Sequence, residues 1–147
     1  MGSLVETLKD PVKRPAVIAD CELLLDAEVK DKRGLSGLAV KAAFKTVKSF
    51  RPNMIGRAMD DLLDDFAMRV DPFWAECQSS GGNPRAFFSS RRTEIANALL
   101  AVTDERASNS PNPVLVKAYK SLRGKAVEHI GAAMPRFSSL IEKHASS

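Results

Sequence analysis

Four aspartates within residues 60–65 have a spacing that could hold a metal ion. On a helix, Asp60 lies one turn from Asp64, and Asp61 lies one turn from Asp65. Hard cations such as magnesium prefer carboxylate oxygens, and a bound ion could bridge a diphosphate. The pattern predicts, as one alternative, a small magnesium-dependent hydrolase or diphosphate-binding enzyme. The sequence favours the other interpretation, a solvated or ion-paired helix face, because no second acidic motif accompanies the first.

Basic residues are concentrated directly before this acidic segment. Residues 32–59 include seven basic side chains and no acidic one, and the net charge of +4 arises after residue 110. Lysines spaced by four and three share one helix face, where they could contact phosphates. A polyanion binder, for nucleic acid or anionic lipid, is therefore a second alternative that would also use the basic C-terminal helix. The candidate anion-binding residues are Lys41, Lys45, Lys48 and Arg51.

Residues suited to nucleophilic catalysis do not occur together in the sequence. His129 is expected to point outward beside Glu128, and His144 lies near the end of the last helix. Cys21 and Cys77 are expected to be packed thiols, because each lies among apolar residues at helical spacing. The sequence therefore predicts no catalytic residue and no cofactor, and it favours a non-catalytic protein.

The elements that would position these residues are helices, because apolar residues recur with a helical period in nearly every segment. We expect a short helix that a capping box at Ser3 to Glu6 opens and Asp10-Pro11 ends, followed by helices from Pro15 to Gly34, at 37–51 and from Asn53 to Val70. Further helices should follow Asp71-Pro72, Asn83-Pro84 and Pro113, with a short last helix after Pro135. Two serines at 89–90 mark a point where the sixth of these helices can break. The predicted fold is all-α, a single compact bundle of about seven helices joined by short loops.

The apolar stripes predict which side chains form the core. Phe44, Phe66, Leu99 and Leu122 each lie at the centre of a stripe, so we expect one shared core around them. On the helix after Pro15, the apolar face is expected to exclude the acidic side chains, which are Asp20, Glu22, Asp26 and Glu28.

The basic and acidic blocks are expected to attract one another. The helices that carry them are joined through Arg51-Pro52-Asn53, and such a short link favours antiparallel packing. Lys41 and Lys45 would then face the segment Asp61 to Asp65.

Length and composition place the chain among ordinary globular proteins. Its 147 residues predict one domain over 1–147. The first thirty residues contain no apolar segment of the kind a secretory signal peptide needs, and no apolar run is long enough to span a bilayer. These features predict a cytoplasmic protein.

Several segments resemble a known group of proteins. They are Arg14-Pro15-Ala16-Val17-Ile18-Ala19-Asp20, Gly34-Leu35-Ser36-Gly37-Leu38-Ala39-Val40-Lys41, Asp71-Pro72-Phe73-Trp74 and Ala98-Leu99-Leu100-Ala101-Val102-Thr103-Asp104. Together they resemble a family of small, all-helical, uncharacterised bacterial proteins. The resemblance implies a helical bacterial protein and assigns no site.

The leading functional hypothesis is a non-catalytic helical protein that acts through a surface for a protein partner, which could be a second copy of itself. The sequence does not favour nucleic acid as a partner, because the helix at 37–51 is rich in alanine and valine, unlike a recognition helix.

Overall fold

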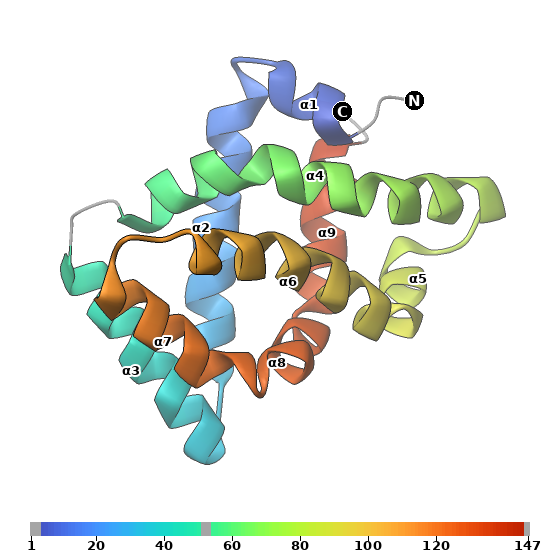
Figure 1. The fold of residues 1–147 in the computed structure, drawn as a ribbon. Helices are drawn as coiled ribbons and strands as arrows, with labels where there is room; N and C mark the ends of the chain where they lie inside the picture. Colours follow the sequence, from blue (N-terminus) through green and yellow to red (C-terminus); the bar gives the residue numbers. More distant parts are fainter. Residues whose placement is uncertain (1–3, 51–53, 146–147) are drawn as a thin grey trace.

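The computed structural model describes residues 4–50 and 54–145, and within these ranges all regular structure is α-helical. The described residues form nine helices, more than the seven or so predicted (Figure 1). They are α1 (Leu4–Lys9), α2 (Lys13–Asp31), α3 (Gly34–Phe50), α4 (Met54–Ser80), α5 (Pro84–Ser90), α6 (Arg92–Ser108), α7 (Pro113–Arg123), α8 (Ala126–Ala132) and α9 (Met134–Ala145). The prediction of an all-α fold is confirmed for the described residues. None of the helices found there is long and apolar enough to cross a membrane.

Two helices begin where asparagine-proline pairs predict. The side chain of Asn83 accepts a hydrogen bond from the backbone of Ala86 at 3.2 Å, and Pro84 occupies the first position of α5. Asn112 caps α7 in the same way. An asparagine oxygen satisfies an unpaired backbone N–H there, and proline lacks only an N–H that the first turn could not bond.

The predicted helix boundary at Pro72 is wrong, because α4 continues through this residue to Ser80. Asp71 was expected to cap a new helix at this point. Its carboxylate instead accepts hydrogen bonds from the backbone of Leu4 at 2.6 Å and of Val5 at 3.3 Å. Asp71 therefore caps the first turn of α1, a helix that lies 67 residues earlier in the chain.

Two further boundaries also differ from the expected ones. The helix that starts at Pro113 ends at Arg123, and a separate short helix, α8, lies between it and the last helix. Pro135 does not stop a helix but occupies the first turn of α9, where its missing N–H does no harm. The break near Ser89 and Ser90 is present, between α5 and α6.

The helices cross at large angles instead of running along one bundle axis. In Figure 1, α4 and α6 lie side by side and run across α2 and α9. Helix α3 packs against α7 at one corner, and α5 packs against α9 at another. Helix α1 packs against the middle of α4 and also contacts α2 and α9 (Figure 1).

The buried core consists of two clusters. The larger one joins α4, α5, α6 and α9 through Val70, Trp74, Cys77, Phe88, Ile95, Met134 and Ile141. The smaller one joins α1, α2 and α4 through Leu8, Val17, Leu63 and Ala67. The four residues predicted to share one core are all only partly buried, so that prediction is wrong. Phe66 and Leu99 line a cavity, which leaves part of their surface without a packing partner.

Candidate functional site

An apolar cavity of about 350 Å³ lies among the helices. Both core clusters contribute to its walls, through residues such as Val17 and Leu63 on one side and Val70 and Met134 on the other. Protein interiors are normally packed as densely as organic crystals and leave few voids larger than a water molecule. An apolar space of this size, partly open to the surface, therefore stands out from ordinary core packing.

The cavity walls are formed by the apolar faces that the sequence predicts for several helices. Leu25 of α2, Val40 of α3, Phe66 of α4 and Leu99 of α6 all line it. Helices α4 and α6 cross α2 and α9 (Figure 1). The stripes therefore face a common space, which their side chains do not fill. The apolar pattern alone could not indicate this, since it is the same for a filled core.

A small polar group lines one part of the cavity wall. Lys32 at the end of α2 donates to Glu28 Oε1 at 3.2 Å and to the backbone oxygen of His129 at 3.2 Å. The side chains of Lys32 and Glu28 are each only 11% exposed. This group thus connects α2 to α8 at the cavity wall.

Glu28 was expected on the outer face of its helix, and this expectation is wrong. It is 8% exposed and it lines the cavity. Its spacing from Val17, Cys21 and Leu24 is the signal that could have revealed this, because steps of four, three and four keep all four residues on one helix face. A buried carboxylate needs partners, and Glu28 has two, Lys32 and Arg136.

His129 also lines the cavity instead of pointing outward beside Glu128. Its Nε2 atom is buried and has no hydrogen-bond partner among the described residues. Burial lowers the pKa of His129 from its ordinary value of 6.5, and the nearby charge of Lys32 lowers it further. Both effects favour the neutral imidazole at pH 7, and its Nε2 atom stays buried behind the apolar surface of the cavity.

Ion pairs hold α2 against α9 along one side of the cavity. Arg136 contacts Glu28 at 2.5 Å and Asp31 at 2.6 Å. Nearer the other end of α9, Lys143 and His144 contact Asp20 at 2.8 Å and 2.7 Å. These two partners lower the pKa of the Asp20 carboxyl group. His144 is thus part of the helix packing and not of a frayed end.

The two cysteines occupy different surroundings. Cys21 lines the cavity, and burial raises the pKa of its thiol to about 11. Cys77 is buried in the larger core cluster, where burial also raises its pKa. Both thiols are kept protonated, which agrees with the packing role predicted for them.

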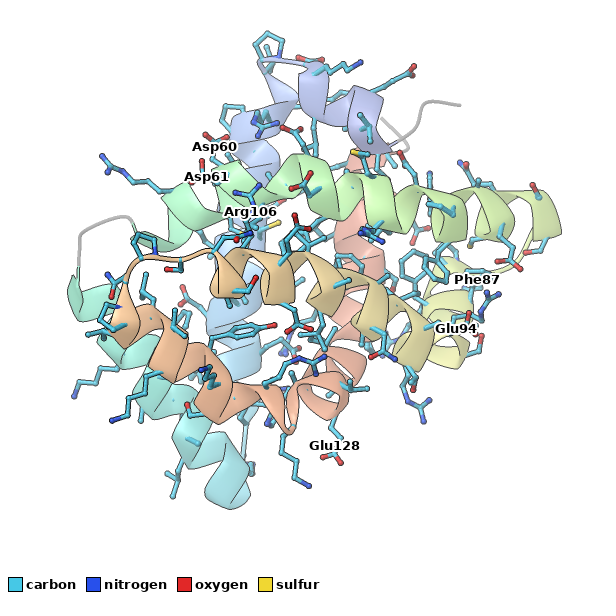
Figure 2. The ribbon with its side chains drawn as sticks, viewed as in Figure 1. Asp60, Asp61, Phe87, Glu94, Arg106 and Glu128 are labelled. Atoms are coloured by element: carbon cyan, nitrogen blue, oxygen red, sulfur yellow. The ribbon has the colours of Figure 1, made fainter. Side chains whose placement is uncertain are left out.

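The acidic segment 60–65 is paired with arginines that the sequence analysis did not consider. Arg14 of α2 contacts Asp60 at 2.8 Å and Asp64 at 3.0 Å. Figure 2 shows Asp60 and Asp61 on α4 and Arg106 on the neighbouring α6, and Arg106 contacts Asp65 at 2.9 Å. Within the described part of the chain, no group of three or more histidine, cysteine, aspartate or glutamate side chains is placed to hold an ion. Magnesium binding by these aspartates stays a prediction.

The basic residues predicted to face this segment lie elsewhere. Lys41 and Lys45 are exposed on α3, and neither takes part in an ion pair found between described residues. The side chain of Lys48 and the whole of Arg51 lie outside the described residues. The expected pairing of α3 with the aspartates fails because α3 also packs against α7, so it does not form a simple hairpin with α4. Anion binding by the four basic residues stays a prediction.

Arg91 forms another cluster that the sequence did not reveal. Its guanidinium contacts Glu76 at 3.0 Å and Glu94 at 2.9 Å, and it lies 5.5 Å from the ring centres of both Phe73 and Phe87. Figure 2 shows Phe87 and Glu94 close together at this end of the molecule. The cluster joins α4, α5 and α6, and none of its residues lines the cavity. We assign it a structural role.

The chain belongs to DUF6918, a family of unknown function, whose model matches residues 4–145. No curated protein and no solved structure matches the chain. The match supports the resemblance to an uncharacterised family and assigns no site, so the site is interpreted from its own geometry.

Proposed function

We propose that this protein is a non-catalytic binding protein that holds a small, mainly apolar molecule in the cavity. The observation that carries the proposal is the cavity itself, with its volume of about 350 Å³ and its largely aliphatic lining. Ligand pockets in proteins start at about 300 Å³ and combine apolar walls with a few polar groups. A bacterial, cytoplasmic setting is part of the proposal and rests on the sequence.

The energetic cost of an empty cavity supports this proposal. Wall atoms that face unfilled space lack van der Waals partners, so an unfilled space of about 350 Å³ lowers the stability of the fold. Small domains have a total stability of only about 5–15 kcal/mol. A bound apolar molecule would offset much of that loss by restoring van der Waals contacts along the walls.

The cavity volume also limits the size of the molecule. At roughly 30 Å³ for each group the size of a water molecule, the space holds roughly a dozen non-hydrogen atoms. A ten-carbon chain or a pair of fused rings fits this limit.

Binding of the small fluorescent dye 1-naphthylamine, a pair of fused rings that is uncharged at neutral pH, tests the proposal. Two variants on the same helix form a matched pair. Leu25→Trp places a larger side chain in the cavity, whereas Leu23→Trp changes a residue that is 65% exposed. We expect the unchanged protein and Leu23→Trp to bind the dye with equal affinity, and Leu25→Trp to bind at least about tenfold more weakly.

Melting temperatures provide a second measurement on the same proteins. The dye should raise the melting temperature of the unchanged protein and of Leu23→Trp, because it binds the folded state. If the dye has no effect on any of the three proteins, or if Leu25→Trp binds it normally, the cavity is not a ligand site.

A second candidate function is binding of a polyanion, nucleic acid or anionic lipid, by the exposed surface of α3 and α7. One observation favours it: the two helices predicted to be basic lie side by side. Lys41 and Lys45 on α3, and Lys117 and Lys120 on α7, are all exposed. Binding to anionic vesicles or to duplex DNA that weakens steeply with salt, and that is lost in Lys41→Glu/Lys45→Glu, would support this function. Equal binding by that variant would exclude this surface.

The hypothesis of a protein-partner surface stays a prediction. The largest exposed apolar side chains come from separate parts of the described chain, and they are Val12, Leu23, Leu38, Met68 and Val114. Apolar side chains exposed one by one are normal on protein surfaces, so they give this hypothesis no particular support.

A further inference from the structure

We infer that the cavity takes one unbranched hydrocarbon chain of about ten to twelve carbon atoms, with no hydrogen-bonding group along the enclosed part. This inference rests on the proposed function and names the class of ligand. The volume alone admits both a linear chain and a pair of fused rings. The arrangement of the lining residues distinguishes between these two shapes.

The cavity is long, because its lining follows the inner face of α2. Residues at every turn of this helix line the cavity, and the first and last of them are Val17 and Lys32. At the helical rise per residue, the separation of these two positions corresponds to about 22 Å along the axis of α2.

The neighbouring helices also indicate a long cavity. Val17 packs with Leu8 of α1 at one end of α2, and Lys32 bonds to the backbone oxygen of His129 of α8 at the other. Both Leu8 and His129 line the cavity, which therefore reaches from α1 to α8. In Figure 1, α9 runs alongside α2 between these two helices. It lines the cavity along its whole length, to Ala145 at its end.

The cavity is narrow for this length. Its volume holds roughly a dozen non-hydrogen atoms, and spread along about 22 Å these leave room for about one atom at each level. A linear chain meets this condition. A pair of fused rings places two atoms at most levels, so the walls would have to move apart, and a well-packed core resists such a displacement.

The walls offer a ligand almost no hydrogen-bonding surface. Several polar residues line the cavity, but the surface that the described residues expose there is almost entirely apolar. The polar side chains contribute carbon atoms to the walls, while their polar atoms bond to groups around the cavity. These bonds join Glu28 to Arg136, Lys32 to the backbone of His129, Thr103 to Tyr119, and His144 to Asp20.

A polar group in the middle of the chain would therefore lose its hydrogen bonds to water without a replacement, which weakens binding. A polar group at the end of the chain need not lose them, because the cavity is partly open to the surface. A free hydrocarbon and the tail of a fatty acid thus share the chemistry that the cavity recognises.

Displacement of 1-naphthylamine from the full chain tests the shape and the polarity of the ligand. The competitors are decane, the fused bicyclic hydrocarbon decalin, and 5-decanol, whose hydroxyl lies in the middle of the chain. Each is supplied as vapour at the same fraction of its saturation pressure, so that differences in hydrophobicity cancel. We expect decane to displace half of the dye at a relative pressure at least about tenfold lower than decalin and about fivefold lower than 5-decanol.

Dissolved decanoate distinguishes the two sources of the chain. Displacement of the dye by decanoate would support the tail of an acid whose carboxylate stays in water. Displacement by decane but not by decanoate would support a free hydrocarbon. Equal displacement by decalin and decane, or by 5-decanol and decane, would show that the inference is wrong while the cavity remains a ligand site. If neither the dye nor decane raises the melting temperature of the unchanged protein, the proposed function fails and the inference fails with it.

A variant at one end of the cavity tests its length. Val29 lines the cavity one turn before Lys32, so the larger ring of Val29→Phe should shorten the space. We expect this variant to bind decane at least about fivefold more weakly relative to hexane than the unchanged protein does. Lys30→Phe, at an exposed position of the same helix, should leave the ratio of decane to hexane affinity unchanged.

If Val29→Phe does not fold, the smaller change Val29→Leu should shift this ratio in the same direction. A folded variant at Val29 that leaves the ratio unchanged would show that the ligand does not extend along α2, and this result would overturn the inference.

Discussion

Arg136 on α9 binds the buried carboxylate of Glu28 on α2, with 2.5 Å between Nη1 and Oε2, although 108 residues separate them. Glu28 also lines the cavity and contacts Lys32. The same carboxylate therefore joins α2 to α9 and fixes the position of the Lys32 ammonium group behind the cavity wall.

Replacing Glu28 by glutamine should lower the free energy of unfolding by about 1–3 kcal/mol, because the charge that Lys32 and Arg136 both use is removed from a site only 8% exposed. Urea denaturation measures the effect. The exposed Glu105 is the matched control, and Glu105→Gln should change the stability by less than about 0.5 kcal/mol. Equal effects of the two substitutions would show that Glu28 is not held in the way described.

Gly37 allows the start of α3 to lie against the end of α2. A Cβ atom at this position would lie 2.8 Å from the backbone carbonyl carbon of Lys32, which is too close. Gly37→Ala should therefore destabilise the fold by about 1–3 kcal/mol, and it should weaken dye binding because it displaces Lys32. Gly124 has no neighbour within 4 Å of a Cβ and has helical backbone angles. Gly124→Ala should leave the free energy of unfolding unchanged or raise it by about 0.4–1 kcal/mol. Thermal unfolding should therefore show a lower melting temperature for Gly37→Ala and an unchanged or higher one for Gly124→Ala.

Arg14 and Asp64 should be energetically coupled, whereas Lys45 and Asp61 should not. The first pair is in contact at 3.0 Å, and the side chain of Asp64 is largely exposed. A double-mutant cycle should therefore give a coupling of about 0.2–1 kcal/mol that decreases at high salt. The cycle on Lys45 and Asp61 serves as the control. Tight magnesium binding that Asp61→Asn abolishes would instead favour a metal site in this segment.

His129 should make the stability depend on pH below 6.5. Its pKa is lowered in the folded state from the ordinary value of 6.5, so the unfolded chain takes up a proton first. The free energy of unfolding should therefore be highest above pH 6.5. It should decrease as the pH falls below 6.5, until His129 is protonated in the folded protein as well. Urea midpoints measured across this range should vary less with pH in His129→Phe than in the unchanged protein. Thr103→Val should retain the full dependence, and a dependence that persists in His129→Phe would assign it to another group.

The features that the sequence determined by itself are local ones. The apolar period predicted helices throughout, and the Asn83-Pro84 pair located the start of α5 to the residue. Capping bonds and helical periodicity act over three or four residues, so a short stretch of sequence contains all the information they need. Asp71-Pro72 shows where local prediction fails. This pair resembles a helix start, but Asp71 instead caps α1, which lies 67 residues earlier in the chain.

Only the tertiary structure decided which residues meet. The sequence identified the aspartates of α4 as candidates for ion pairing, but it could not show that their partners are Arg14 and Arg106, which lie 41 to 50 residues away in the chain. The sequence could not reveal the cavity either. The apolar stripe of a helix has the same residues whether the side chains of the facing helix fill the space next to it or leave it unfilled. The volume of the cavity depends on the angles at which α4 and α6 cross α2 and α9, and these angles result from packing over the whole chain. Helical periodicity explains why Glu28 faces inward, but only the fold placed Lys32, Arg136 and His129 around it.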